Sequence, residues 1–246
     1  MSGHSKWSTI KRKKEATDSK RANVFTKIGR EIAVAVREGG GDPSSNSKLR
    51  DLIAKAKANN VPNDNIDRLI KKCLGDGDKS SYEEMTYEGY GPCGVAVIVE
   101  ALTDNRNRTA GDVRHFFDKY GGNMGAAGCV SWSFDKKGVI VINNEDEDLD
   151  EDAVMMDALE AGADDVEKDG EVFEVTTDPD AFQQVFDALE KAGYQFVSAQ
   201  VEMVPQNYIS VTDEGDRKNL NKMLEMFEDN DDVQNVWHNW ENADEE

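Results

Sequence analysis

The 246-residue sequence has few cysteines, few bases and no long apolar run. Val95 to Val99 is among the longest such runs, and it is far shorter than the ~20 residues of a membrane-spanning helix. No apolar stretch follows the basic N-terminus, so a secretory signal is not expected. The three cysteines, Cys73, Cys93 and Cys129, form no CxxC pair, which argues against a disulfide framework or a zinc ribbon. We therefore expect a cytoplasmic protein without membrane contact.

Basic residues are scarce and unevenly distributed. The chain holds 29 Lys and Arg against 50 Asp and Glu, a formal net charge of −21, which by itself argues against nucleic-acid binding. Residues 1–80, however, hold 18 bases and 10 acids, a net +8, whereas residues 81–246 hold 11 and 40, a net −29. Because the Debye length is about 10 Å at 0.1 M salt, a basic segment can bind phosphates while an acidic body stays away from them. The sequence thus predicts polyanion binding confined to its N-terminal part.

The basic part has the periodicity of three amphipathic helices. Apolar residues recur every three or four positions from about Asp18 to Glu38, and three glycines end this helix. Asp42 is expected to cap a second helix that begins at Pro43, and a third runs from Pro62 to about residue 75. Residues 2–17 contain too few apolar groups to offset the entropy of ordering, so we expect a mobile arm.

The acidic part alternates strands and helices. Residues 138–204 follow the order β-α-β-β-α-β, which is ferredoxin-like. Residues 207–240 supply a strand at 208–211, a helix and a strand at 233–237. With strands at 95–102 and 130–134 and the helix between them, they give a second ferredoxin-like order. We therefore predict an α+β fold of three domains: a basic helical N-terminal domain with a mobile arm (1–80), a discontinuous α/β domain (81–135 and 205–246) and an inserted ferredoxin-like domain (136–204).

The candidate nucleic-acid contacts lie in the first 30 residues. Closely spaced cations beside the aromatic Trp7 and Phe25 suit phosphate contacts combined with base stacking. The alternative is a solvated basic helix face. The predicted contacts are Lys6, Trp7, Lys11, Arg12, Lys13, Lys14, Lys20, Arg21, Lys27 and Arg30.

A second cluster of arginines and amides lies where a strand gives way to a helix, at residues 104–109. Such a cluster at a helix start can bind a phosphate or a carboxylate. The alternative is a capped loop in which the arginines pair locally with Asp104 and Asp112. The residues proposed for a secondary contact are Asn105, Arg106, Asn107, Arg108 and Arg114.

The residues give no indication of catalysis. His4, His115 and His238 are far apart, and no spacing predicts a metal site or a nucleophile–base pair. We expect no catalytic residue, metal, cofactor or small-molecule substrate.

Several motifs resemble those of the YebC family. They are residues 1–7 (MSGHSKW) with Ile10-Lys11, Phe25-Thr26-Lys27, residues 39–43 (GGGDP), residues 87–92 (YEGYGP), residues 104–109 (DNRNRT) and residues 121–123 (GGN). The resemblance implies a helical N-terminal domain, two α/β domains and no catalytic residues. It adds His4 to the nucleic-acid contacts, together with Lys6, Trp7, Lys11, Lys13 and Lys14.

The resemblance also implies a role in gene expression. Members of the family are described as DNA-binding transcriptional regulators, its mitochondrial relatives as translational activators of cytochrome c oxidase, and bacterial members as factors that relieve ribosome stalling at proline-rich sequences. We expect a non-enzymatic regulator that binds nucleic acid, with two mechanisms open: a DNA-binding transcription regulator, or a translation factor that binds the ribosome through rRNA. No predicted helix has a clear recognition-helix pattern.

Overall fold

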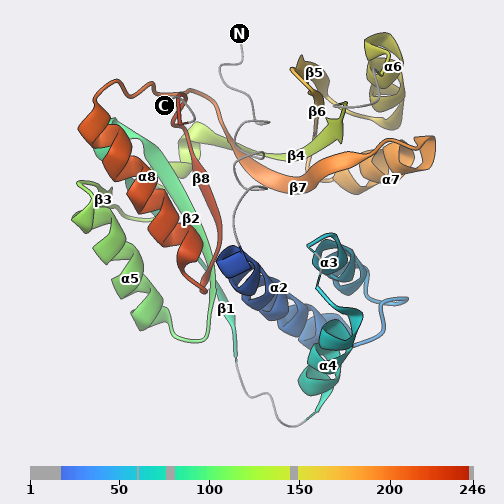
Figure 1. Cartoon of the computed structure of the whole chain (residues 1–246), viewed down its shortest axis with the longest axis horizontal. Coiled ribbons are helices and arrows are strands. Elements are labelled where there is room, and N and C mark those ends of the chain that lie inside the picture. Colours follow the sequence, from blue (N-terminus) through green and yellow to red (C-terminus); the bar gives the residue numbers. More distant parts are fainter. Residues whose placement is uncertain (1–17, 60, 76–80, 145–148, 244–246) are drawn as a thin grey trace. The chain divides into compact units, whose positions relative to one another are not determined.

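The computed structural model describes residues 18–59, 61–75, 81–144 and 149–243 (Figure 1). The predicted arm and most of the predicted linker at 76–81 lie outside these ranges. The described residues belong to two compact units, one within residues 16–129 and 213–236, the other within residues 130–212 and 237–246. Among the helices of these ranges, none combines the length and the hydrophobicity of a membrane span.

The first unit begins with the three predicted helices, α2 (Asp18–Gly39), α3 (Ser47–Ala58) and α4 (Asn63–Leu74). Their apolar stripes meet in one core, which contains Ile28, Ile32, Val36, Leu49, Ala56, Ile66 and Ile70. The predicted start of the second helix was four residues too early. Asp42 accepts hydrogen bonds from the backbone and hydroxyl of Ser44 and holds a turn, and Asn46 then caps α3 by accepting from the amide of Leu49 at 3.1 Å.

A four-stranded sheet completes this unit, with the spatial order β3-β1-β2-β8. The strands are β1 (Glu83–Tyr90), β2 (Ala96–Thr103), β3 (Asn123–Met124) and β8 (Val233–His238), and the helices are α5 (Arg106–Lys119) and α8 (Glu214–Asp229). Phe117 of α5 and Phe227 of α8 pack with their rings 5.0 Å apart. A side chain at Gly89 would lie 2.9 Å from the Phe117 ring, so the close approach of β1 and α5 requires glycine there.

Two predicted strands of this sheet are wrong. Residues 131–133 form a 3₁₀ turn, η2 (Ser131–Ser133), and Ile209 makes a single β-bridge to Trp240. Strand β1, which precedes β2 in sequence, takes the place in the sheet that the predicted strand at 208–211 would have had. It lies between β2 and β3 and is antiparallel to both. Short apolar runs do not distinguish a strand from a buried turn, and their pairing depends on distant residues.

The second unit contains the predicted ferredoxin-like domain. Its elements are β4 (Phe134–Asn143), α6 (Glu151–Ala161), β5 (Asp165–Asp169), β6 (Val172–Thr177), α7 (Phe182–Ala192) and β7 (Phe196–Pro205). The sheet order β5-β6-β4-β7 and its antiparallel pairings confirm the prediction. Ile140, Ile142 and Phe173 on one sheet face pack against Val154 of α6 and Val185 of α7.

Candidate nucleic-acid interface

The predicted contacts of the N-terminal arm lie outside the described residues: His4, Lys6, Trp7, Lys11, Arg12, Lys13 and Lys14. Lys20 and Arg21 belong to α2, but their side chains are also outside the description. Of the predicted primary contacts, this leaves Lys27 and Arg30 as the two whose side chains the structure describes.

Lys27 and Arg30 make contacts within the protein. The Lys27 ammonium donates to the carbonyl of Glu228 in the last turn of α8, and the amide of Asn23 donates to the carbonyl of Asp229 at 3.4 Å. Carbonyls at a helix C-terminus lack partners inside their own helix and carry partial negative charge, so a lysine there is stabilising. This polar face of α2 thereby caps α8.

Arg30 continues the same face of α2 and reaches the end of β2. Its guanidinium donates to the carbonyl of Leu102 at 3.1 Å and forms an ion pair with Asp232. The Arg30 side chain is only 16% exposed. Arg30 is therefore paired within the first unit, and its role as a phosphate contact stays a prediction.

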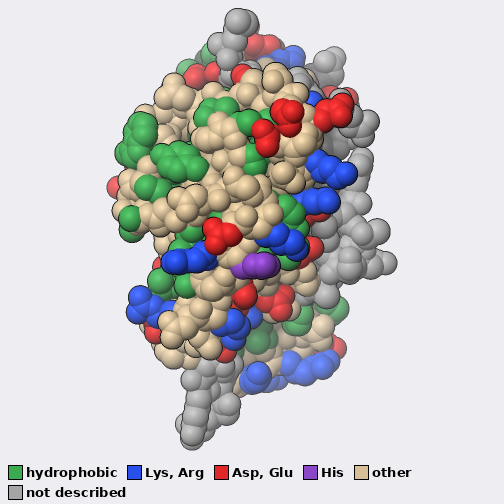
Figure 2. Space-filling model, turned by 90° about the vertical axis from the view of Figure 1, so that its left-hand side faces the viewer, with side chains coloured by type: hydrophobic (Ala, Val, Ile, Leu, Met, Phe, Trp, Pro, Cys, Tyr) green, Lys and Arg blue, Asp and Glu red, His purple; other side chains and the backbone are tan. Residues whose placement is uncertain are grey.

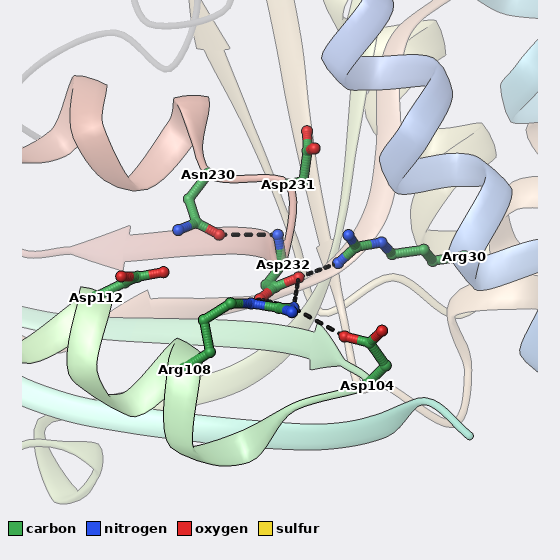
Figure 3. Close-up of a pocket in the computed structure, with 7 residues that line it drawn as sticks. All are labelled: Arg30, Asp104, Arg108, Asp112, Asn230, Asp231 and Asp232. Carbon is green, nitrogen blue, oxygen red and sulfur yellow. Dashed lines mark hydrogen bonds and ion pairs between the residues drawn. The ribbon is translucent and has the colours of Figure 1, made fainter. Parts of the chain in front are cut away.

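Asp232 is the centre of this arrangement (Figure 3). Its carboxylate is 5% exposed and accepts hydrogen bonds from Arg30, from Arg108 at 2.8 Å, and from the hydroxyls of Thr109 at 2.7 Å and Thr103 at 3.3 Å. The donors come from α2, α5 and β2, and Asp232 itself immediately precedes β8. One buried carboxylate thus joins four elements of the unit. We call Asp232 and its four donors, Arg30, Arg108, Thr109 and Thr103, the Asp232 cluster.

The charges of the Asp232 cluster are mutually compensated. Burial raises the pKa of Asp232, but hydrogen bonds from Arg108, Thr109 and Arg30 outweigh it and hold the pKa below its usual value. The hydrogen bonds to Asp232 and Asp104 raise the pKa of Arg108. A buried carboxylate is stable only when it is paired. The guanidiniums of Arg30 and Arg108 therefore serve as the counter-charges of Asp232.

A pocket of about 310 Å³ opens beside the Asp232 cluster (Figure 3). Four carboxylates, two guanidiniums and one amide line it, from Asp104, Asp112, Asp231, Asp232, Arg30, Arg108 and Asn230. This lining has a net negative charge, so the pocket does not fit a phosphate.

The second predicted cluster, residues 104–109, is a capped helix start. Asn105 caps α5 by accepting from the amide of Arg108 at 3.1 Å, and Arg108 pairs with Asp104 at 2.8 Å, as the local alternative predicted. The predicted partner Asp112 is replaced by Asp232, which lies 124 residues beyond Arg108 in sequence. No sequence signal identifies that partner.

The other predicted secondary contacts remain at the surface. Arg106 forms a loose pair with Glu83 at 3.6 Å and is 63% exposed. Asn107 and Arg114 are exposed on α5. The Arg108 guanidinium, in contrast, binds Asp232 (Figure 3).

The helical domain presents further bases that the motif analysis did not select. Residues 18–75 hold 12 Lys and Arg against 7 Asp and Glu. Exposed bases occur on all three helices: Arg37, Lys48, Arg50, Lys55, Lys57, Arg68, Lys71 and Lys72. Lys48 and Lys55 pair with Glu38 and Glu31 of α2. In the sequence, bases that alternate with the apolar stripe of each helix would have predicted these exposed side chains.

The face bearing α5 and α8 has a different character. Figure 2 shows that Lys and Arg side chains are interspersed there with Asp and Glu. A surface of mixed sign does not provide the continuous positive field that a polyanion needs.

The chain is therefore an α+β protein in which a basic three-helix domain precedes two sheet-containing α/β domains, with no metal-binding cluster among the described residues. It belongs to the TACO1/YebC family: residues 5–76 match the TACO1/YebC protein N-terminal domain, and residues 82–240 match the TACO1/YebC second and third domain.

Relatives share nearly the whole length of the chain. A protein from Acetivibrio thermocellus is 59% identical over 240 residues, covering 98% of this chain and 99% of the relative. One from Ruminiclostridium cellulolyticum is 58% identical over 245 residues, covering 100% and 98%. Both are named probable transcriptional regulatory proteins. The crystal structure of a conserved hypothetical protein from Aquifex aeolicus is similar, with a TM-score of 0.84 and 43% identity over 96% of this chain and 97% of that one.

Proposed function

We propose that this protein is a non-enzymatic regulator of gene expression that binds nucleic acid through its N-terminal helical domain and arm. The relatives named probable transcriptional regulatory proteins support the regulatory role. The observation that carries the nucleic-acid contact is the separation of charge. Residues 1–80 have a net charge of +8, and the remaining residues a net charge of −29.

The exposed bases of the helical domain suit phosphates better than base edges. They are spread over three helices, mostly as lysines, and α4 also carries exposed Asp64 and Asp67. A lysine contacts a phosphate as a point charge, whereas base readout in a groove uses several bidentate side chains from one element. Binding would then depend on phosphate position and shape, with little sequence readout.

Side chains of α2 cap the C-terminus of α8, and this contact supports a fixed placement of the binding helices. Lys27 and Arg30 connect α2 to α8, β2 and Asp232 within one compact unit. The acidic remainder of the chain repels phosphates, so the helical domain and the arm would provide the contact.

The name of the relatives favours DNA as the target. None of the described helices has the pattern of a groove-reading helix, which favours a folded RNA. This supports the second mechanism, a translation factor that binds ribosomal RNA and acts on translation or stalled ribosomes. Structured RNA is recognised mostly through shape and backbone contacts.

Crosslinking in cells, followed by sequencing of the bound DNA and RNA, distinguishes the two mechanisms. Recovery of rRNA positions would establish the ribosomal mechanism, and promoter DNA without rRNA would establish the transcriptional one. Recovery of neither polymer above an uncrosslinked control would contradict the proposed function.

The role of the arm is tested with Lys11→Glu combined with Lys13→Glu. This double variant should abolish nucleic-acid binding in a gel-shift or filter assay, because two phosphate contacts become repulsive. The exposed α8 lysines give a matched control, Lys218→Glu with Lys222→Glu, which changes the net charge equally and should leave binding nearly unchanged. Intact binding by the arm variant would show that the arm is not the contact.

A further inference from the structure

Helix α6 of the ferredoxin-like domain exposes an unusual group of apolar side chains. Met155 is 37%, Met156 59% and Leu159 47% exposed. The large apolar side chains exposed among the described residues number eight, and three of them lie on one turn of this helix. We call them the α6 apolar face. Clustered apolar side chains at the surface of a protein mark interaction sites more often than scattered ones do.

The α6 apolar face is not part of the domain core. Successive residues of a helix are separated by 100°, so Val154 and Ala158, which are buried, point to the sheet while Met155, Met156 and Leu159 point to one flank. The opposite flank faces α7: Asp157 accepts a hydrogen bond from Tyr194 at 2.7 Å, and the carbonyl of Ala161 accepts one from Gln184 of α7 at 2.9 Å. The apolar face is therefore turned away from α7 and toward solvent.

Acidic residues surround this face. Glu151, Asp152 and Glu160 lie on α6 itself, and all three are exposed. The domain as a whole is strongly acidic, because residues 136–204 contain 4 Lys, no Arg and 20 Asp and Glu. An occupant of the face must tolerate this field, which excludes polyanions, anionic lipid surfaces and a second copy of the same domain.

We propose that the α6 apolar face is the docking site for a basic amphipathic helix of another protein. Apolar side chains of that helix, spaced three and four residues apart, would lie on Met155, Met156 and Leu159, and its lysines and arginines would face the acidic rim. Methionine side chains are flexible and polarisable, which suits a surface that receives a partner helix. The inference is independent of nucleic-acid binding, since it concerns a different domain and the opposite charge.

A designed peptide tests the chemistry of the site. The probe is a synthetic amphipathic helix of about 18 leucines and lysines, long enough to be helical when bound, and its control is a shuffled peptide of identical composition. The matched variant of the full-length protein is Met156→Glu with Leu159→Glu. Both side chains are exposed, so the fold should be retained, which far-UV circular dichroism checks.

The variant separates apolar from electrostatic binding, because two added carboxylates would strengthen a purely electrostatic attraction. We expect the variant to bind the probe at least about tenfold more weakly in a fluorescence anisotropy titration, as expected when two apolar contacts are lost. The shuffled peptide should bind the unmodified protein more weakly by a similar factor. Equal or tighter binding by the variant, or equal binding of the shuffled peptide, would overturn the proposal.

A photo-crosslinking amino acid at Met156, in cells, identifies the natural occupant, with the same group at the exposed Ala188 of α7 as the control. We expect crosslinks specific to position 156 whose mapped peptides are basic, with apolar residues three and four apart. Crosslinks to nucleic acid, to a second copy of this chain, to the same proteins from both positions, or to nothing at all would contradict the proposed occupant.

Discussion

At the scale of single residues, Asp232 determines how several parts of the first unit meet. It receives hydrogen bonds from α2, α5 and β2, and its own carbonyl accepts from the amide of Leu102 at 2.7 Å. Because it is almost fully buried, its charge is stable only with these partners. The loss of this one carboxylate would leave two guanidiniums without their shared counter-charge.

Replacement Asp232→Asn should lower the free energy of unfolding by about 3 kcal/mol at neutral pH, since it breaks a buried ion-pair network. Urea unfolding followed by circular dichroism measures the change. The neighbouring exposed Asp231→Asn is the control and should stay within about 0.5 kcal/mol of the unmodified protein. Equal effects of the two substitutions would show that the Asp232 cluster does not stabilise the fold.

The same carboxylate predicts a pH dependence. The pKa of Asp232 is lower in the folded state than its usual value of about 3.9. Its contribution to stability is therefore complete above about pH 4 and is lost as the pH falls through the folded-state pKa. The difference in unfolding free energy between the unmodified protein and Asp232→Asn should shrink below about pH 4. A difference that stays constant down to pH 3 would contradict this.

At the scale of elements, the two faces of α2 have different tasks. One face supplies Ile28, Ile32 and Val36 to the helical core, and the other supplies Lys27 and Arg30 to the contact with α8 and Asp232. Both basic residues belong to the predicted nucleic-acid contact, yet their charges are used to join elements. A basic side chain near an apolar stripe is thus ambiguous until its neighbours are known.

The start of α3 offers a test of helix capping in the same domain. Asn46 is 7% exposed, caps α3, and also donates to the carbonyls of Ala35 and Gly40, each at 2.8 Å. Asn46→Ala should therefore lower the unfolding free energy by about 2 kcal/mol, combining a lost cap with unsatisfied carbonyls. The exposed Ser47→Ala is the control. Thermal unfolding of the two variants checks the expectation, and an equal loss in both would refute it.

At the scale of the whole molecule, the separation of charge predicts a strong dependence of nucleic-acid affinity on salt. If about six bases contact phosphates, the slope of log K against log salt concentration should be about −4 to −5. Titrations between 50 and 200 mM salt, roughly the range in which such slopes are measured, check this. A slope near zero would exclude phosphate contacts as the source of affinity.

The contribution of α3 and α4 to that slope can be isolated. Lys57→Glu with Lys71→Glu changes two exposed lysines for which the described residues show no ion pair, and it should make the slope less steep by about 1.5 to 2. Lys218→Glu with Lys222→Glu on α8 is again the matched control. A slope unchanged by the first pair would show that Lys57 and Lys71 do not contact phosphates.

Periodicity was sufficient to predict the three N-terminal helices, because one turn repeats every 3.6 residues and buries one face. It was also sufficient for the order of strands and helices in the ferredoxin-like domain, because each of these elements carries its own period. It was insufficient for the strands at 130–134 and 208–211, since strand pairing joins residues far apart. The division into domains at residues 80, 135 and 204 and the contacts of the arm stay predictions.

The charge of each part, the helix periods and the family motifs follow from the amino-acid sequence, because composition and spacing are local properties. Only the tertiary structure shows that Arg108 pairs with Asp232 across 124 residues, that Arg30 pairs with the same carboxylate, and that Met155, Met156 and Leu159 remain exposed. Which charge is neutralised and which apolar side chain is left uncovered depend on neighbours that only the folded chain brings together.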